Sequence, residues 1–480
     1  MKIKPLYLLI VLFIFIQQVF SQSEVDALRY SKSQTFGTTR MMGMGGAFTA
    51  LGADVSSVAI NLGGIAAFRG SDVSVTPLLC FTDVSAKFNN QLTSDIKYSF
   101  ALSNLGFVKT WILDDDNSNS TWKSVHFGFS YNKTSDFNRN ILANNLSASG
   151  SFLDQYVVMA NNGQVNNLLK TVDLIYLNQD STAYLSDYSN TSYGQRQQLI
   201  LQTEGSAGEF NFAFGGNFNN VLMAGVSMSF HNVHYKENYT FTEEDPDGLI
   251  PNLEYFNVHK PFTTNGDGFS MKFGLIARPT EWLRAGLAYQ SPVFYSFTDK
   301  YGDNAESAIE YENGIFTNKA RETKSEFDWE LTSPQVVRLG IGFIIMKTAI
   351  LSLDYEWIDY PKARMQSDDY NFITENQAIT DTYKGNGNVK TGAEYRYGPF
   401  AFRGGLGING NPYTSGHDNS NAKNWQYSLG FGIKDKNVSV DFSWVKQNFN
   451  EKYFAYGSAE SMVKLEGETN LLSATFSMRF

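Results

Sequence analysis

The sequence is poor in charged residues and has almost no cysteine. Asp, Glu, Lys and Arg make up 18% of the 480 residues, below the roughly 25% that is usual for a soluble domain. The one cysteine, Cys80, excludes an internal disulfide framework and a metal site built from several cysteines, and is expected to be a small buried hydrophobe. The chain therefore has few charged residues with which to cover an ordinary globular surface, which favours surroundings other than water alone.

Basic residues are outnumbered as well. The chain has 38 Lys and Arg against 48 Asp and Glu, which gives a formal charge of −10 and a sequence pI of about 5.1. Nucleic-acid binding normally requires a basic footprint, so no nucleic acid is expected as a partner. Aromatic residues are abundant instead, with 38 Phe, 26 Tyr and 7 Trp, and this excludes a disordered chain.

The first residues resemble an export signal. Lys2 and Lys4 precede an apolar run at 6–16, and a small residue, Ser21, follows at the position where a signal peptidase would cut. The run is shorter than the roughly 18 residues that a membrane anchor needs. We therefore predict a signal peptide at 1–21, cleaved after Ser21. No cysteine follows the cut, so a lipid anchor is not expected, and no later stretch predicts a spanning helix.

Apolar and polar residues alternate with period two in many segments. Examples are 222–230, 283–290, 351–357 and 438–444, where every second residue is apolar. This pattern predicts strands with one apolar face. Alternation alone fits a soluble sandwich as well as a membrane barrel whose apolar face meets lipid, so the choice depends on the loops.

Fourteen segments are predicted to be strands, with boundaries good to several residues. They are 72–89, 95–110, 122–137, 207–217, 220–241, 266–278, 281–301, 335–346, 348–360, 387–397, 400–411, 424–434, 437–455 and 470–480.

Short and long connections follow one another in a regular order. The connections after even-numbered strands are tight, except for 111–121, whereas most of the others are long: 138–206, 242–265, 302–334 and 361–386, the first one at 90–94 being short. Such sorting places the turns at one barrel end and the loops at the other. We therefore predict an all-β fold, a transmembrane antiparallel β-barrel of about 14 strands at 70–480, in the outer membrane of a Gram-negative bacterium.

The end of the chain supports the same fold. The last strand has one apolar face and stops on an aromatic residue, Phe480, which resembles the C-terminal signature of bacterial outer-membrane barrels. The signature implies recognition by the barrel assembly machinery and contact with outer-membrane lipid. The alternative, a soluble edge strand, would leave a long apolar edge open to aggregation.

Residues 22–69 do not follow the strand pattern. They are rich in small residues and turns, and their glycines include Gly37, Gly43, Gly45, Gly46, Gly52, Gly63 and Gly64. Fourteen strands enclose more space than side chains fill. We therefore predict that 22–69 is a hatch, or plug, in the lumen, with a periplasmic tail as the alternative.

Several stretches together resemble a known family. Residues 26–30, 37–40, 44–54 and 60–65 resemble the hatch of FadL-type outer-membrane transporters, most of all their Bacteroidetes branch, and 278–292 and 353–360 resemble barrel strands of that family. The resemblance implies a fourteen-stranded barrel that carries long-chain fatty acids or other hydrophobic compounds passively. The family usually has Asn-Pro-Ala near the end of the hatch, whereas this chain has Asn61, Leu62 and Gly63, and loses the constraint of the proline ring.

Catalytic and metal sites are not predicted. The glycines at 43–46 lack the strand that precedes a dinucleotide loop. His231 and His234 lie three residues apart on a strand, so they point to opposite faces and do not share a metal. The acidic stretch 114–118 lacks the glycine and distal glutamate of a calcium loop. We expect no enzyme activity, no cofactor and no metal.

The long loop at 138–206 is predicted to be extracellular and partly helical. Ser151 is a suitable N-cap, and the apolar residues that follow fit an amphipathic helix. So much apolar area in a surface loop suggests a lid or groove that captures ligand, although helices that pack only on neighbouring loops are the alternative. The residues expected to capture ligand are Phe152, Leu153, Tyr156 and Val157.

These features combine into a transport hypothesis. A hydrophobic molecule would bind under the loop, pass to the hatch and leave when the hatch rearranges, either through the wall or into the periplasm. The hatch residues assigned to ligand binding are Phe36, Met41, Met42, Met44, Phe48, Asn61, Gly63 and Gly64. The competing functions are a surface or structural barrel, such as an adhesin or antigen, and a general porin.

Overall fold

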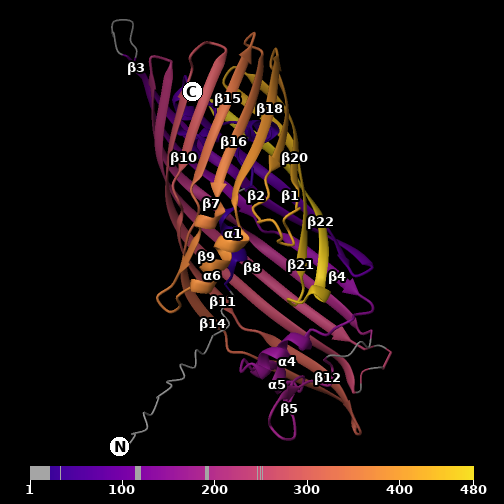
Figure 1. The fold of residues 1–480 in the computed structure, drawn as a ribbon. Coiled ribbons are helices and arrows are strands. Elements are labelled where there is room, and N and C mark those ends of the chain that lie inside the picture. Colours follow the sequence, from indigo (N-terminus) through magenta and orange to yellow (C-terminus); the bar gives the residue numbers. More distant parts are fainter. Residues whose placement is uncertain are drawn as a thin grey trace, which may run out of the picture.

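The first strand and the last strand of the sheet pair with each other. In the computed structural model, β1 (Asp72–Phe88) pairs antiparallel with β2 (Gln91–Ile112) on one side and with β22 (Met462–Arg479) on the other. The sheet therefore closes on itself into an antiparallel barrel of 14 spanning strands (Figure 1). Closure pairs the edges, as a lipid environment requires. The predicted fold class is confirmed.

The structure describes residues 22–32, 34–113, 121–189, 194–245, 247–248, 250 and 252–480. The predicted signal peptide at 1–21 and the acidic stretch 114–118 lie outside these residues.

Eleven further spanning strands complete the circle between β2 and β22. Two of them are interrupted at Ser-Pro steps, Pro292 between β10 and β11 and Pro334 between β14 and β15, where the proline has no N–H to donate. The eleven further strands are β3 (Trp122–Asp136), β7 (Arg196–Phe218), β8 (Leu222–Glu244), β9 (Leu253–Ala277), β10 (Leu283–Gln290) with β11 (Phe294–Tyr301), β14 (Ser325–Thr332) with β15 (Val336–Ile345), β16 (Ala349–Asp359) with β17 (Arg364–Gln366), β18 (Gly385–Tyr397), β19 (Phe400–Asn409), β20 (Asn424–Asp435) and β21 (Val438–Phe454).

Three predicted loops are shorter than expected. The segment 138–206 contains β4 (Arg139–Asn145) and the start of β7, and β8 and β9 leave little of 242–265 as loop. The prediction of a loop at 302–334 is wrong, because this segment holds the hairpin of β12 (Asn304–Tyr311) and β13 (Gly314–Arg321) and also β14.

The error has a physical reason, which is seen on β8. Its outward face is apolar up to Phe230, which is 47% exposed, and then becomes polar at Asn232, His234 and Lys236. Lipid covers only the apolar part, so the strand continues into water with its backbone ladder intact and its sequence signal lost. No helix in the described part of the chain is both long and apolar enough to cross a membrane.

The long connections gather at one end of the barrel and the tight turns at the other, next to the C-terminus (Figure 1). The loop end is expected to face outward, as in other outer-membrane barrels. It carries α4 (Leu153–Asn161), α5 (Asn167–Thr171), β5 (Tyr176–Leu177), β6 (Tyr184–Leu185) and the β12–β13 hairpin, and α6 (Ile373–Thr382), η2 (Tyr360–Lys362) and η3 (Ala459–Ser461) belong to other connections.

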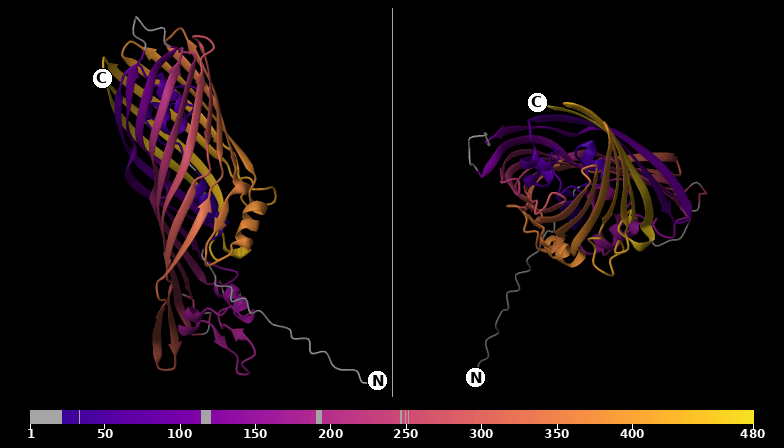
Figure 2. Two further views of the ribbon diagram at one scale, coloured as in Figure 1. Left: turned by 90° about the vertical axis from the view of Figure 1, so that its left-hand side faces the viewer. Right: turned by 90° about the horizontal axis from the view of Figure 1, so that it is seen from above.

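The N-terminal segment lies inside the barrel, as Figure 2 shows in the view along the barrel. It contains α1 (Glu24–Ser31), α2 (Thr39–Gly43), α3 (Ser57–Ile60) and η1 (Leu62–Ala67). The helix α2 contacts β19 to β22, and η1 contacts β7, β8 and β9 on the opposite wall. The expected hatch in the lumen is confirmed.

Candidate functional site

The apolar hatch residues form one cluster against the barrel wall. Phe36, Met41, Met42, Met44 and Phe48 are at most 7% exposed and belong to the same core. The wall contributes Leu78 and Cys80 of β1, Val445 of β21 and Leu471 of β22. The structure thus brings together five of the residues that the sequence assigned to ligand binding.

Only part of this cluster faces open space. A cavity of about 70 Å³ lies between the hatch and strands β15, β16 and β18, and Phe36 and Met41 line it on the hatch side, together with Ile60. Met42, Met44 and Phe48 do not line this cavity. Their part in ligand binding stays a prediction.

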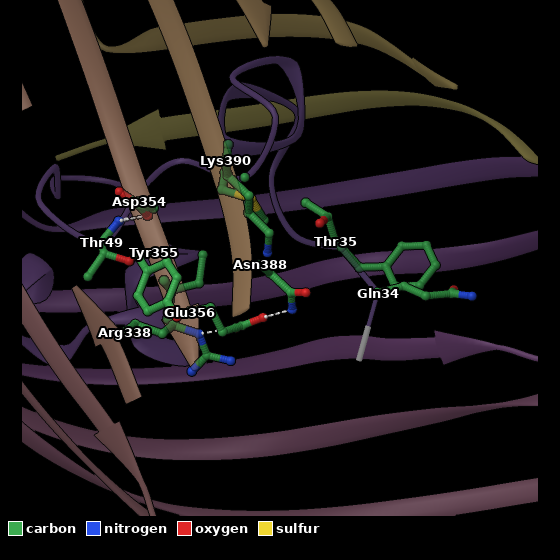
Figure 3. Close-up of a pocket in the computed structure, with 13 residues that line it drawn as sticks. Gln34, Thr35, Thr49, Arg338, Asp354, Tyr355, Glu356, Asn388 and Lys390 are labelled. Atoms are coloured by element: carbon green, nitrogen blue, oxygen red, sulfur yellow. Dashed lines mark hydrogen bonds and ion pairs between the residues drawn. The ribbon is translucent and has the colours of Figure 1, made fainter. Parts of the chain in front are cut away.

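The wall side of the cavity is polar, as Figure 3 shows. Arg338 Nε donates to Glu356 Oε2 over 2.6 Å, and Asn388 Nδ2 donates to Glu356 Oε1 over 2.8 Å. Asp354 Oδ2 accepts from the backbone N–H groups of Phe48 and Thr49, at 2.8 and 2.7 Å. Sequence reasoning missed these wall residues, although polar residues at inward positions of β16 were a visible signal.

A ring of glycines on the inner wall receives the hatch backbone. A Cβ atom on Gly405 would lie 2.2 Å from Gly45 N, and one on Gly286 would lie 2.2 Å from Thr49 O. Any other residue would therefore push the hatch away from the wall. We call this ring the glycine girdle, and its clearest members are Gly225 of β8, Gly274 of β9, Gly286 of β10, Gly340 of β15, Gly392 of β18 and Gly405 of β19.

The turn at the end of the hatch is held by Asn61. Its Nδ2 donates to Thr49 O over 2.7 Å and to Leu275 O of β9 over 3.0 Å, while its Oδ1 accepts from Gly63 N. A Cβ atom on Gly63 would lie 2.6 Å from Ile276 N, so glycine is needed for the close approach to β9. Neither Asn61, Gly63 nor Gly64 lines the cavity. Asn61 and Gly63 contact β9, whereas Gly64 packs on Ser57 within the hatch, and their part in ligand binding stays a prediction.

Ion pairs also hold the hatch. Arg40 Nε lies 2.9 Å from Glu394 Oε2 of β18, and Arg403 of β19 contacts the same carboxylate at 2.7 Å. Arg396 contacts its other oxygen at 2.6 Å, and the Glu394 side chain is fully buried. A buried carboxylate needs such partners. Sequence reasoning missed this cluster, because Arg40 lies more than 300 residues before the other three members.

The helix α4 packs at the loop end of the barrel (Figure 1), and we call this helix the lid and this end of the barrel the mouth. Phe152, Leu153 and Val157 are buried in a core built with strand residues from the loop end of the wall, and the Phe152 ring lies 5.1 Å from that of Phe241. Tyr156 is partly buried, and its hydroxyl accepts from Lys260 Nζ over 2.9 Å. The four residues predicted to capture ligand therefore fill the mouth instead of lining an exposed groove, and they are not in the same cluster as the hatch residues.

The start of this lid is tied to a buried carboxylate. Glu243 of β8 accepts from Ser151 Oγ at 2.7 Å, from Phe152 N at 3.1 Å and from Gln197 Nε2 at 3.0 Å. Glu243 lies beyond the lipid-facing part of β8, and burial raises the pKa of its carboxyl to about 7. The expected N-cap, Ser151, also accepts from Leu153 N at 3.1 Å.

The wall has one long break in its backbone pairing. The β2–β3 ladder ends at Asn104 and Asn132, and residues 91–103 of β2 have no backbone partner on that side, because the chain after β3 turns into β4, which pairs with β7. Side chains bridge this unpaired wall: Lys97 Nζ lies 2.6 Å from Glu204 Oε1, and Ser99 Oγ lies 3.4 Å from Asp136 Oδ2. Alternation within β2 gave no sign of the break.

The two histidines of β8 lie on opposite faces of the strand, as predicted. His231 is buried and hydrogen-bonded to Ser270, whereas His234 is exposed. Within the described ranges, no three His, Cys, Asp or Glu residues are arranged to hold a metal ion.

The glycine girdle can be tested with Gly405→Ala. The new Cβ would lie 2.2 Å from Gly45 N and 2.4 Å from Met44 C, so the hatch turn must shift. We expect overpacking to destabilise the seated hatch by about 1–3 kcal/mol and to increase single-channel conductance in planar bilayers. Gly404→Ala is the matched control, because the nearest heavy atom lies 3.9 Å away. Equal conductance of the two variants would contradict a girdle that seats the hatch.

The lid should respond to pH through Glu243. Because its folded pKa is raised from 4.5 to about 7, the lid is most stable below pH 4.5 and loses stability as the pH rises to 7, by at most on the order of 3 kcal/mol. The protection factors of the α4 amides, which correct hydrogen exchange for the faster intrinsic rate at higher pH, should therefore be lower at pH 8 than at pH 5. Glu243→Gln should remove the difference, and Glu244→Gln, at an exposed neighbouring position, should keep it. A pH dependence that survives Glu243→Gln would refute the assignment.

Comparisons with known proteins agree with this architecture. The model of the family "Outer membrane protein transport protein (OMPP1/FadL/TodX)" matches residues 211–480. Among solved structures, a Pseudomonas aeruginosa FadL homologue is 11% identical, with 94% of this chain and 100% of that chain covered and a TM-score of 0.54. The Pseudomonas putida toluene transporter TodX is 12% identical, with the same coverage and a TM-score of 0.52.

At such identities the structures support the fold alone, and no curated protein matches the sequence. The family model itself spans more than half of the chain and includes the strands that carry the polar wall of the cavity. The chain therefore belongs to the OMPP1/FadL/TodX family of outer-membrane transport proteins.

Proposed function

We propose that this protein carries hydrophobic compounds, such as long-chain fatty acids, passively through the outer membrane. Family membership supports outer-membrane transport of hydrophobic compounds in general. In the proposed path, a molecule enters beneath the α4 lid, reaches the hatch at the cavity lined by Phe36 and Met41, and leaves when the hatch rearranges.

The observation that carries the proposal is the apolar lining of both closures of the lumen. At the mouth, α4 turns Phe152 and Leu153 inward, and at the hatch, Phe36 and Met41 face a cavity. An adhesin has no use for apolar residues that face inward. A porin needs a wide water-filled lumen, whereas this hatch backbone is pressed against the glycine girdle.

The unpaired wall between β2 and β3 is the proposed exit. In this conformation the girdle closes the way past the hatch, while the wall at 91–103 is bridged by side chains without a backbone ladder. Separating side chains disrupts fewer backbone hydrogen bonds than opening a ladder, which is costly in lipid. Tyr98 and Phe100, which belong to this stretch, are 66% and 78% exposed and offer an apolar outer surface there.

Uptake of a hydrophobic tracer tests the path. Replacing Phe36 and Met41 with Ser should weaken tracer binding about ten- to a hundredfold per site, since each apolar side chain contributes roughly 1.5–3 kcal/mol. The defect should be large at low tracer concentration and recover as the concentration rises. Met346→Ser is the control, because Met346 is 89% exposed in a turn. Normal uptake by the double variant, with the barrel assembled, would refute the path.

A cross-link tests the exit separately. Ser99→Cys and Asp136→Cys should be joined by a short thiol-reactive cross-linker that contains a disulfide. The link should hold β2 and β3 together and stop uptake until the disulfide is reduced. The control pair is Ser85→Cys with Ser94→Cys, which lies on the intact β1–β2 ladder. Cys80 is buried and should not interfere. Uptake that continues through the linked wall would favour release past the hatch.

A further inference from the structure

One carboxylate oxygen at the hatch cavity has no partner. Asp354 is 5% exposed, and its Oδ2 is fully engaged by the backbone N–H groups of Phe48 and Thr49. Its other oxygen, Oδ1, is buried and has no hydrogen-bond partner among the described residues. A buried acceptor without a donor is costly, so a donor on a bound water or on a ligand would stabilise this atom.

Asp354 lines the cavity beside the hatch, which gives the missing donor a place. The volume of about 70 Å³ exceeds the roughly 10–15 Å³ that one water requires. One side of the cavity is apolar, with Phe36, Met41 and Ile60 of the hatch. A molecule with an apolar body and one polar end fits such a lining.

The charges around the cavity select the kind of polar end. Arg338 and Lys390 bring two positive charges to the lining, and Asp354 and Glu356 bring two negative ones. Arg338 is already paired with Glu356 at 2.6 Å. The site is therefore balanced and offers no surplus charge to a charged ligand.

We propose that the cavity binds the hydroxyl group of an uncharged hydrophobic molecule, an alcohol or a phenol, which donates to Asp354 Oδ1. The inference rests on the proposed transport of hydrophobic compounds and, within that class, favours hydroxyl compounds over fatty acids at this site. A carboxylate has no donor at neutral pH and would face an acceptor. An ammonium group would be repelled by the positive charges of Arg338 and Lys390. A hydrocarbon would leave Asp354 Oδ1 without a hydrogen bond.

Binding to the purified full-length protein in detergent tests the inference. The probes each contain ten carbon atoms: 1-decanol, methyl nonyl ether, decane and decanoate, each competing with a fluorescent hydrophobic tracer. The wild-type protein should bind decanol about ten- to a hundredfold more tightly than the ether, because a hydrogen bond to a charged acceptor is lost with the ether. Decane and decanoate should also bind more weakly than decanol.

Asp354→Asn should change this order. The amide oxygen can keep the two bonds to the hatch backbone, while the amide N–H₂ replaces the free acceptor with a donor. The ether should then bind at least as tightly as decanol. Asp381→Asn, at an exposed position on α6, should behave as the wild type. Single-channel conductance checks that the hatch of each variant is still seated.

The outcomes separate this inference from the transport proposal. If no probe displaces the tracer and cells take up no tracer, the transport function itself fails. If the tracer is bound and taken up but the wild type does not distinguish decanol from the ether, only the hydroxyl inference is overturned. It is also overturned if decanoate binds best, or if Asp354→Asn keeps the preference for decanol with its hatch in place.

Discussion

Backbone contact between the hatch and the inner wall is the constraint on which the rest of the structure depends. A barrel of 14 strands is too wide for its own side chains to fill. The hatch fills it only because wall positions such as Gly274 and Gly405 have no side chain where the hatch main chain passes. Larger residues at these positions would hold the hatch away from the wall and leave gaps between the two. Closure of the lumen is therefore encoded jointly by the N-terminal segment and by inward glycines on distant strands.

The lumen is closed at more than one level. The mouth core contains Phe152 of the lid, and the hatch core contains Met41 and Met42. Between them lies a third core, in which Tyr30 of α1 packs on Phe297 and Trp329 of the wall. A hydrophobic molecule on its way through would exchange one apolar surface for another, provided that each closure moves in turn. In the proposed passive transport, packed apolar side chains would have to rearrange at each closure.

The sequence predicted the barrel and the hatch better than the site. Alternation and loop order are local signals, and they were right wherever lipid forces an apolar outward face. They failed at 302–334, where the strands stand in water. Phe36 and Met41 could be proposed from the sequence because the hatch is contiguous, whereas Asp354 and Lys390 meet them only after the barrel closes. The family assignment is confirmed, and its Bacteroidetes branch stays a prediction.

If the hatch moves as proposed, its ion pairs allow each buried charge to keep a partner. A buried pair is costly to break when one partner is left uncompensated. When Arg40 withdraws, Glu394 keeps Arg396 and Arg403 at 2.6 and 2.7 Å. Arg40 itself has Asp54 of the hatch 4.0 Å away. Each side thus retains a charge partner, so the hatch can leave the wall without exposing a bare buried charge. The main resistance to movement is then the packing against the glycine girdle.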